Sequence, residues 1–449
     1  MLKLKNISNF YFIGIGGIGM SAIANYFKHN GKNVAGYDKT STKITDALQA
    51  LGIDVHFEDS VDLIDKAFKN REETLIIYTP AVPVEHLELN YFLTHNFEVL
   101  KRSEILGEIT KSTTCLAVAG THGKTTTSAL LGHILKVANA NATSFLGGIS
   151  ENYNSNLILG GSEISVVEAD EFDRSFLRLF PNVACITSMD ADHLDIYDDL
   201  SQLESAFVEF SEQVSDTLII RKGLPIKGIT YGIEEEADFN AENIRITNGV
   251  YTFDVKTPGE YIKNIQINIP GRHNVLNAVA ALAMANSYGI SLQVIAEALL
   301  SFKGIKRRFS YKIKTDHLVL IDDYAHHPTE INALVDSVRE MYPSQEILGI
   351  FQPHLFSRTR DFADDFAKSL SRFDELILLD IYPAREIPIK GINSNWLLNK
   401  IFIKNKTLST KEDLNQHVLN SNATVIVMFG AGDIGELVDI IKNKLEVEN

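Results

Sequence analysis

Cysteine is scarce in this sequence, which holds only Cys115 and Cys185 among 449 residues. Each lies in an apolar run, and their spacing fits neither a metal-binding nor a redox motif. A cysteine-ligated metal site and a dithiol active site are therefore excluded. We expect both cysteines to be core residues in a reducing compartment.

Long apolar runs and an excess of positive charge are also missing. No apolar stretch reaches 18 residues, which excludes a membrane-spanning helix. The formal net charge of −16 argues against nucleic acid and anionic membranes as partners, because both would repel such a surface. An apolar run after Lys3 and Lys5 imitates a signal peptide, but its four glycines suit a turn better than a helix. We therefore expect a cytoplasmic protein.

What the sequence does contain is a regular alternation of apolar, strand-like runs with helical patterns. Such alternation predicts an α/β fold with parallel sheets covered by helices. A chain of 449 residues is long enough for about three domains of ordinary size. We expect a Rossmann-like N-terminal domain over 1–108, a central P-loop-type ATPase domain over 109–308 and a Rossmann-like C-terminal domain over 309–449.

A first glycine-rich loop, "GIGGIG", follows the strand-like run "NFYFI" and precedes a helical pattern. Gly14, Gly16 and Gly19 match the dinucleotide-binding spacing, in which backbone amides at a helix N-terminus face a pyrophosphate. Asp38 follows Gly19 by 19 residues, close to the ~20 typical of a ribose-binding acid. The loop therefore predicts a diphosphate ligand and leaves its identity open.

The same glycine spacing occurs again near the C-terminus, in "FGAGDIGE". Its glycines are Gly430, Gly432 and Gly435, and only 14 residues follow the last of them. That length is too short for another strand with a ribose-binding acid. We interpret this copy as close packing of a helix on a strand.

A second type of loop, "GTHGKTTT", follows the strand-like run "CLAVA". Val118 stands where a full P-loop has its first glycine, so the motif is a shortened one. Gly120 and Gly123 let backbone amides approach phosphate, Lys124 can reach the β and γ oxygens, and the Thr125 hydroxyl can bind Mg²⁺. The loop predicts a nucleoside triphosphate site.

Acidic residues end two neighbouring strand-like runs of this central region. They are Glu168, Asp170 and Glu171 in "VVEADEFD", and Asp190, Asp192 and Asp195 together with His193 in "SMDADHLD". Because the carboxyl ends of parallel strands meet at the ligand crevice, we expect these side chains beside the phosphate loop. Such acids are suitable partners for Mg²⁺.

These motifs, taken with "GRHNVLNA", "DDYAHHPTE" and "FQPHLFSRTRD", resemble the ATP-dependent Mur ligases of bacterial peptidoglycan synthesis over the whole chain. The resemblance implies that the first domain binds a UDP-sugar, the central domain ATP and the third an amino acid. "GIGGIGMS" is most similar to the family members that join L-alanine to the carboxylate of UDP-N-acetylmuramate through an acyl phosphate. Members that re-attach a salvaged tripeptide are the main alternative.

The resemblance also implies roles for particular residues. By this resemblance, the residues expected to contact the UDP-sugar are Gly14, Gly16, Gly17, Ile18, Gly19, Met20, Asp38, Thr79, Pro80 and Ala81. The residues expected to contact ATP are Gly120, Thr121, His122, Gly123, Lys124, Thr125, Thr126, Asn274 and Asn277. The expected Mg²⁺ ligands are Thr125, Glu168 and His193. The expected catalytic residues are Lys124, His193, Arg308, Asp323 and His326. The residues expected to contact the amino acid are His354, Arg358 and Arg360.

Several of these assignments have an ordinary structural alternative. Thr79 to Val82 could be ordinary loop packing, and Arg358 and Arg360 could be solvated arginines at a helix start. His327, next to the predicted catalytic His326, could cap the following helix or take part in catalysis. No lysine occurs between His193 and Ile220, so we expect no carbamylated lysine of the kind found in sibling ligases. Phe172 and Arg174 also depart from the family's "EADESDGS" pattern, whereas Glu168 matches it.

Two readings outside the ligases compete with this one. A dehydrogenase would use the first loop but leaves Lys124 and Thr125 without a role. A nucleotide-binding regulator would bind ATP without releasing phosphate in response to a substrate. We expect UDP-N-acetylmuramate, ATP and L-alanine as partners, with Mg²⁺ as cofactor, in a monomer or weak homodimer.

Overall fold

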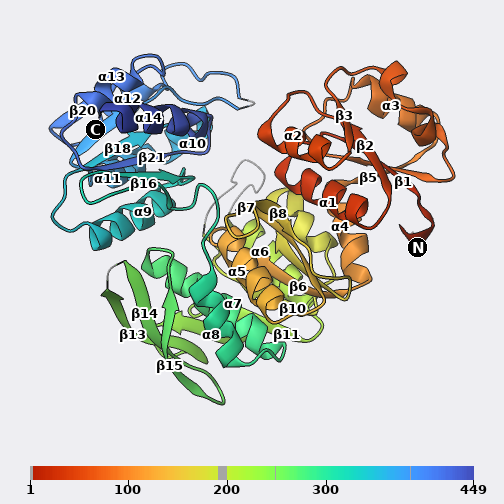
Figure 1. The fold of residues 1–449 in the computed structure, drawn as a ribbon, viewed down its shortest axis with the longest axis horizontal. Helices are drawn as coiled ribbons and strands as arrows, with labels where there is room; N and C mark the ends of the chain where they lie inside the picture. The colour runs from red at the N-terminus through yellow and green to blue at the C-terminus, as the bar shows by residue number, and fades with distance from the viewer. Residues whose placement is uncertain (1–3, 191–199, 248, 385, 449) are drawn as a thin grey trace. The chain divides into compact units, whose positions relative to one another are not determined.

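The computed structural model describes residues 4–190, 200–247, 249–384 and 386–448. Contacts between Cα atoms divide the chain into two compact units. The first contains Met1–Arg245, Thr252–Ile267 and Val275–Lys303, and the second contains Ile246–Tyr251, Asn268–Asn274 and Gly304–Asn449. The first unit carries one sheet and most of a second, and the second unit carries a third sheet together with the strand tips at residues 246–247 and 250–251 of the second sheet (Figure 1).

The N-terminal sheet is parallel and has the order β3-β2-β1-β4-β5. Its strands are β1 (Asn9–Ile13), β2 (Asn33–Tyr37), β3 (Asp54–His56), β4 (Thr74–Tyr78) and β5 (Glu98–Lys101). Its helices are α1 (Ile18–His29), α2 (Lys43–Ala50), α3 (Leu87–Thr94) and α4 (Arg102–Lys111). Phe10 and Phe12 pack in a core with α1 and α4, whereas Tyr11 and Ile13 pack in a second core with α3. Alternate residues of β1 thus bury the two faces, as in a doubly wound sheet.

The central sheet has the order β15-β14-β13-β12-β11-β10-β6-β9-β7-β8. Its strands are β6 (Thr114–Ala119), β7 (Ala142–Ser150), β8 (Ser155–Ile158), β9 (Ile164–Ala169), β10 (Val183–Ile186), β11 (Thr217–Arg221), β12 (Ile229–Ile233), β13 (Phe239–Thr247), β14 (Val250–Lys256) and β15 (Tyr261–Ile267). Its helices are α5 (Lys124–Val137), α6 (Leu200–Glu212), α7 (Arg272–Ser287) and α8 (Leu292–Ser301). The strands around the phosphate loop are parallel as expected, but β8 runs antiparallel to β7.

The C-terminal sheet has the order β16-β17-β21-β18-β19-β20. Its strands are β16 (Ser310–Lys314), β17 (Val319–Asp323), β18 (Ile347–Phe351), β19 (Glu375–Leu378), β20 (Asn405–Leu408) and β21 (Val425–Phe429). Its helices are α9 (Pro328–Met341), α10 (Phe356–Asp361), α11 (Ala363–Leu370), α12 (Ser394–Leu398), α13 (Leu414–Leu419) and α14 (Ile434–Glu448). The sheet is parallel except for its edge strand β16, which pairs antiparallel with β17.

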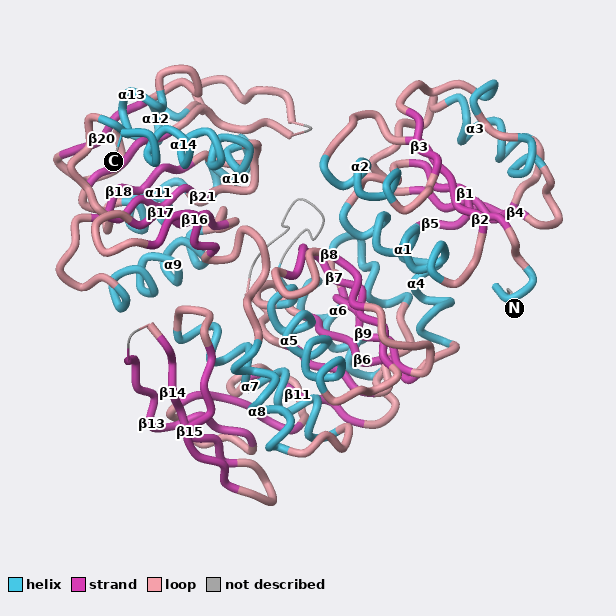
Figure 2. Tube along the Cα trace, viewed as in Figure 1, coloured by secondary structure: helices cyan, strands magenta, loops and turns pink. Residues whose placement is uncertain are grey.

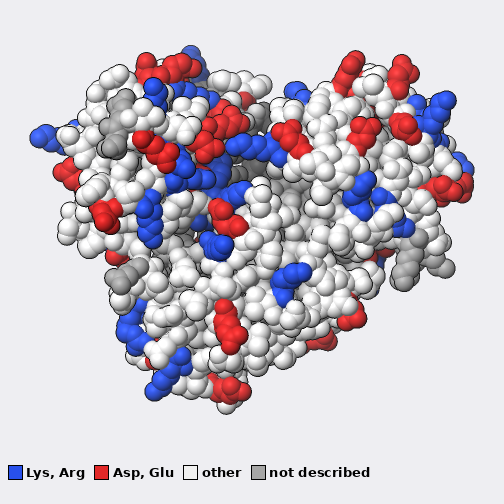
Figure 3. All heavy atoms as spheres, in the orientation of Figure 1, with Lys and Arg blue, Asp and Glu red and all other residues white. Residues whose placement is uncertain are grey.

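The α/β class predicted from the sequence is confirmed, and Figure 2 shows helices flanking the strands of each sheet. Cys115 on β6 and Cys185 on β10 are buried and free, as expected for core residues. Within the described residues, no helix combines the length and apolar character needed to cross a membrane. Figure 3 shows Lys and Arg interleaved with Asp and Glu on the face drawn.

Candidate active site

The phosphate loop connects β6 to α5, and its two glycines are required by the backbone. Gly120 has φ +132° and Gly123, the N-cap of α5, has φ +82°. A Cβ atom at Gly120 would lie 2.1 Å from the Thr187 hydroxyl oxygen, and one at Gly123 would lie 2.6 Å from Oδ1 of Asn277. Both crowding and the left-handed conformation exclude larger residues. The Thr121 and His122 amides donate to Ser188, so the amides left for a ligand are those of the first turn of α5, at a helix N-terminus of the kind that binds phosphate.

Hydroxyl groups at the end of β10 hold this loop in place. Thr121 Oγ1 lies 2.9 Å from Ser188 Oγ, which also accepts a hydrogen bond from the His122 amide at 2.8 Å. Thr187 Oγ1 donates to the His122 carbonyl at 2.5 Å, and the Asp190 amide donates to Thr121 Oγ1 at 3.0 Å. Sequence reasoning missed Thr187 and Ser188. Their position at the carboxyl end of a strand beside β6 is the signal that could have found them.

Lys124 begins α5, and its ammonium is directed into the loop. Nζ donates to the Gly120 carbonyl at 2.6 Å and to both carboxylate oxygens of Glu171, at 2.9 and 2.7 Å. Burial lowers the pKa of Lys124, but the carboxylates of Glu171, Asp170 and Glu168 outweigh it, so the net shift is upward. The lysine is therefore a permanent cation in the loop.

Thr125 and Glu168 meet beside the lysine. The Thr125 hydroxyl donates to Glu168 Oε1 at 3.0 Å, and the Gly147 amide donates to Oε2 at 3.0 Å. The two side chains place oxygen ligands of the type that Mg²⁺ prefers next to the phosphate loop. Across the described residues, no group of three His, Cys, Asp or Glu side chains could hold a metal, but Mg²⁺ commonly uses one or two carboxylates with phosphate oxygens. The chemistry of the pair therefore fits the ion.

The remaining residues predicted for this loop have mixed outcomes. His193, a predicted metal ligand and catalytic residue, lies outside the described residues. Asn277 lies against Gly123 and accepts a hydrogen bond from Thr127 Oγ1 at 3.4 Å, so the structure brings it to the loop. Thr126 is buried on the first turn of α5. Asn274 donates to the Pro270 carbonyl at 2.5 Å within the second unit.

The N-terminal glycine loop is shaped in a similar way. Gly14 has φ +85°, and a Cβ there would lie 2.6 Å from the methyl group of Thr79. Asp38 directly follows β2 and accepts a hydrogen bond from the Gly16 amide at 2.7 Å, so this acid supports the loop. Gly17 is the N-cap of α1, and no side chain caps that helix. The first-turn amides of residues 18–20 are thus placed to receive an anion.

Two further parts of this domain bear on the predicted UDP-sugar site: the loop after β4 and the start of α4. Pro80 and Ala81 are exposed in the loop after β4. Arg102, which sequence reasoning missed, begins α4 and lies against Gly19, where a Cβ would stand 3.0 Å from its Nη1. Its guanidinium is also 3.6 Å from Asp170. A cation therefore stands beside the open N-terminus of α1.

In the second unit, Asp323 ends β17 and is almost fully buried. Its carboxylate accepts hydrogen bonds from the amides of Phe309 at 2.6 Å and Ala325 at 2.7 Å. Burial raises the pKa of Asp323 to about 6, although Arg308 and the two amides oppose the shift. Asp323 thus fixes the backbone that leads to Arg308 on one side and His326 on the other.

His326 is held in one orientation by its Nδ1 atom. That atom lies 2.9 Å from the Tyr324 carbonyl and 3.1 Å from the Glu330 carboxylate, so Nδ1 is the protonated nitrogen. Burial lowers the pKa of His326 and favours the neutral ring, which leaves Nε2 as a proton acceptor. Arg308 lies 3.4 Å from the same Glu330. The structure therefore brings Arg308 and His326 together.

The predicted amino-acid contacts divide into two groups. The ring of His354 lies 6.0 Å from that of His326, and burial lowers the pKa of His354 to about 4. The charge of Arg358 contributes to the lowered pKa of both histidines, which places it near them. Arg360 instead pairs with Asp361 at 2.7 Å on the surface. It is not brought to the cluster.

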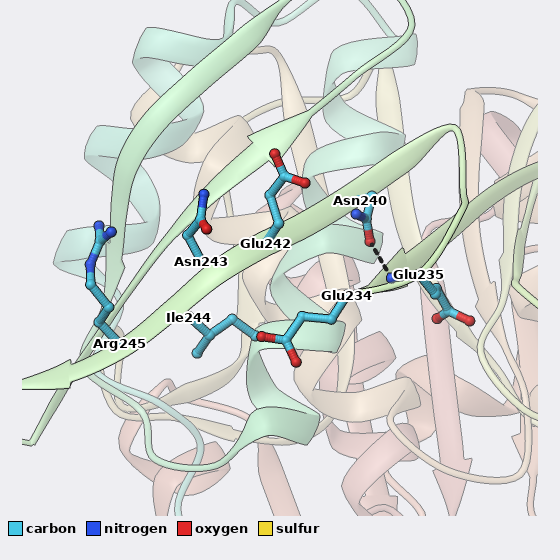
Figure 4. Close-up of a pocket in the computed structure, with 7 residues that line it drawn as sticks. All are labelled: Glu234, Glu235, Asn240, Glu242, Asn243, Ile244 and Arg245. Atoms are coloured by element: carbon cyan, nitrogen blue, oxygen red, sulfur yellow. Dashed lines mark hydrogen bonds between the residues drawn. The ribbon is translucent and has the colours of Figure 1, made fainter.

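A shallow pocket of about 620 Å³ lies elsewhere in the first unit (Figure 4). Its lining residues come from β13 and the turn after β12: Glu234, Glu235, Asn240, Glu242, Asn243, Ile244 and Arg245. Figure 4 shows their side chains spread along the strand, with one hydrogen bond drawn between Asn240 and Glu235. No residue predicted from the sequence lines this pocket, and it does not coincide with the phosphate loop.

Comparison with known proteins decides the family. The Mur ligase family catalytic domain matches residues 9–114, the Mur ligase middle domain 118–285 and the Mur ligase glutamate ligase domain 307–432. The chain belongs to the Mur ligase family. The resemblance inferred from the motifs and the three-domain α/β fold are thereby confirmed.

Individual relatives cover the whole of this Mur ligase. UDP-N-acetylmuramate–L-alanine ligase from Flavobacterium psychrophilum is 60% identical over 99% of this chain and 100% of its own. The crystal structure of UDP-N-acetylmuramate-alanine ligase from Thermotoga maritima superposes with a TM-score of 0.85 at 29% identity, over 98% of this chain and 100% of that one. A murein peptide ligase structure from Psychrobacter arcticus has a TM-score of 0.68 at 22% identity, over 98% of both chains, and shares the fold.

The C-terminal glycine copy of this Mur ligase serves packing. A Cβ at Gly430 would lie 2.6 Å from the Gln352 carbonyl oxygen, and one at Gly435 would lie 2.7 Å from the guanidinium carbon of Arg307. The Ile434 amide at the start of α14 donates to Gln352 Oε1 at 2.9 Å. A side chain therefore takes an amide that an anion would need, which agrees with the packing interpretation.

Proposed function

We propose that this Mur ligase joins L-alanine to the carboxylate of UDP-N-acetylmuramate and converts ATP to ADP and phosphate. The observation that carries the proposal is the phosphate loop, where the Lys124 ammonium is directed at the Gly120 carbonyl and the Thr125 hydroxyl meets Glu168 of β9. The full-length similarity to the alanine-adding ligase of Flavobacterium psychrophilum supports L-alanine as the amino acid. Tripeptide salvage has weaker support, because the murein peptide ligase from Psychrobacter arcticus shares only the fold.

The chemistry needs ATP because a carboxylate and an amine do not condense at neutral pH. The muramate carboxylate attacks the γ-phosphorus, the bond to the β–γ bridging oxygen breaks, and an acyl phosphate and ADP form. Lys124 and the amides of the loop neutralise the charge that develops on the phosphate oxygens. Thr125 and Glu168 would hold Mg²⁺, which supplies further charge neutralisation when bound. His193 stays a predicted partner in this role.

The second step is attack of the alanine amine on the acyl carbon, with phosphate as leaving group. The amine must lose a proton, and Nε2 of His326 is the base we assign. Its ring is kept neutral by burial and oriented through Nδ1, which are the properties a base requires. His354 and Arg358 stand beside it as the predicted contacts to the amino acid.

The UDP-sugar is assigned to the N-terminal loop. Its pyrophosphate would meet the first-turn amides of α1, and Arg102 supplies a positive charge at the same place. Asp38, Thr79, Pro80 and Ala81 remain predicted contacts to the nucleoside. Cys115 and Cys185 are buried and form no disulfide, which suits a reaction in the cytoplasm.

Phosphate release tests the proposal directly. Purified protein is given ATP, Mg²⁺ and UDP-N-acetylmuramate with L-alanine, glycine, L-serine or the tripeptide L-Ala-γ-D-Glu-meso-diaminopimelate. We expect phosphate and a new UDP-sugar product with L-alanine, and neither when the nucleotide sugar is left out. Coupling of the tripeptide without coupling of L-alanine would replace the proposal with the salvage reaction. ATP binding with no release of phosphate under any condition would indicate a regulator.

A further inference from the structure

The ammonium of Lys124 has no proton left for a nucleotide in this structure. An ammonium group carries three N–H donors. The two carboxylate oxygens of Glu171 lie at 2.9 and 2.7 Å from Nζ, and the Gly120 carbonyl lies at 2.6 Å. These three close acceptors use the three donors, and a fourth acceptor, the Thr121 carbonyl, lies farther away at 3.5 Å. A phosphate oxygen can therefore contact Lys124 only if one of them is given up.

Glu171 is placed to hold the lysine firmly. Its side chain is fully buried, and that of Lys124 is 12% exposed. A buried carboxylate with a cation at 2.7 Å forms a strong, charge-assisted hydrogen bond. A buried ammonium without an anion would be costly, so the loop needs a counterion whenever no nucleotide is bound. Glu171 supplies it.

The neighbouring acid has a different partner. Glu168, three residues earlier at the end of β9, accepts from the Thr125 hydroxyl and the Gly147 amide. The two glutamates of "EADE" thus engage consecutive residues of the loop, Lys124 and Thr125. Of these two glutamates, Glu171 is the one that occupies donors of the Lys124 ammonium.

We propose that Glu171 is a positioning residue that holds Lys124 inside the phosphate loop and competes with the phosphates of ATP for its ammonium. The inference rests on the proposed function, because it requires Lys124 to bind nucleotide phosphate. ATP must break the ion pair between Lys124 and Glu171, which reduces the net free energy of ATP binding. The carboxylate of Glu171 then also repels the phosphates. Glu171 therefore stabilises the empty loop and weakens nucleotide binding.

The test is equilibrium binding of Mg·ADP to the full chain without UDP-sugar, measured by titration calorimetry. Removing the competing charge in Glu171→Gln is expected to lower Kd about tenfold, the factor for losing one charged hydrogen bond. The Tm of the nucleotide-free variant should fall, and Mg·ADP should raise it by more than it raises the wild-type Tm. Glu163→Gln is the matched control, since it makes the same change at an exposed residue just before β9 and should alter neither quantity.

A merely structural role for Glu171 predicts the opposite sign. Disordering the loop would weaken nucleotide binding, so an unchanged or higher Kd in Glu171→Gln overturns the inference. If that variant does not fold, Glu171→Asp keeps the charge but shortens the reach, and it must also lower Kd, by a smaller factor. Lys124→Ala separates the two proposals. Unchanged Mg·ADP affinity in Lys124→Ala would reject the phosphate site itself, whereas weakened affinity there without a gain in Glu171→Gln rejects only the competition.

Discussion

The Thr125 hydroxyl donates a hydrogen bond to the Glu168 carboxylate across 3.0 Å, which joins the first turn of α5 to the carboxyl end of β9. A second bond, from the Gly147 amide at 3.0 Å, fixes the other carboxylate oxygen. Preorganised oxygen ligands of this kind require little movement to accept Mg²⁺ beside bound phosphates. The pair therefore defines the side of the loop on which the metal is expected.

Glu168→Gln removes one charged ligand while it keeps the shape of the side chain. We expect the Mg²⁺ concentration for half-maximal phosphate release to rise at least about tenfold, as is usual when a metal's supporting shell is damaged. Thr125→Ser keeps the hydroxyl and should respond nearly as wild type does. Glu163→Gln, an exposed residue near the start of β9, controls for loss of one negative charge. A Glu168→Gln enzyme with the wild-type Mg²⁺ dependence would remove this residue from the metal site.

Lys124→Ala tests the charge that we assign to the γ-phosphate. We expect phosphate release to fall roughly a hundredfold to a thousandfold, because one preorganised donor to the transition state is lost. Lys136→Ala is the matched control: this lysine lies in the last turn of the same helix and donates to the Leu159 carbonyl. Its activity should stay at the wild-type level. Near-normal amide synthesis by Lys124→Ala would refute the assigned role of the loop.

The phosphate loop was accessible from sequence because its features are local. Gly120, Gly123 and Lys124 lie within five residues, between one strand and one helix, and their backbone needs follow from residue type. The strands and helices around them were predictable for the same reason, since apolar periodicity is read over short windows. The antiparallel edge strands β8 and β16 were not, because pairing direction depends on distant partners.

The contacts that complete the site were beyond sequence reasoning because they join distant positions. Lys124 and Glu171 are 47 residues apart, and His122 and Ser188 are 66 apart. The sequence placed Glu171 in an acidic cluster suited to metal, whereas the structure pairs it with the lysine. Arg102 carries no motif at all, and only the packing of α4 against Gly19 reveals it. Arg360 is the opposite case: the motif predicted it as a site residue, but the structure pairs it with the neighbouring Asp361.

The proposed role of His326 as the base predicts how the reaction rate depends on pH. Burial lowers the pKa of His326, so the neutral ring, the form that the proposed base needs, persists below the ordinary histidine value of about 6.5. The acid limb of the pH–rate profile should therefore lie below that value, with activity lost as the ring is protonated. His326→Gln should lower kcat about a hundredfold and abolish this limb.

The control for His326 is His317→Gln, which changes an exposed histidine of the same domain. Its pH–rate profile should match that of the wild type. A profile of His326→Gln that keeps the same acid limb at a reduced rate would assign the titrating group elsewhere. His326 would then be a residue that orients substrate rather than the base.

Arg102 provides the last test, because its proposed partner is the pyrophosphate of the UDP-sugar and not ATP. Arg102→Ala should raise KM for UDP-N-acetylmuramate at least about tenfold, the cost of one charge-assisted contact, and leave KM for ATP near its wild-type value. Arg102→Lys keeps the charge but loses the planar fork, so its defect should be smaller. Arg71→Ala removes an exposed arginine of the same domain that pairs with Glu72, and it should change neither constant. Equal increases in both KM values for Arg102→Ala would show that the guanidinium supports the central domain through Asp170 instead of binding the nucleotide sugar.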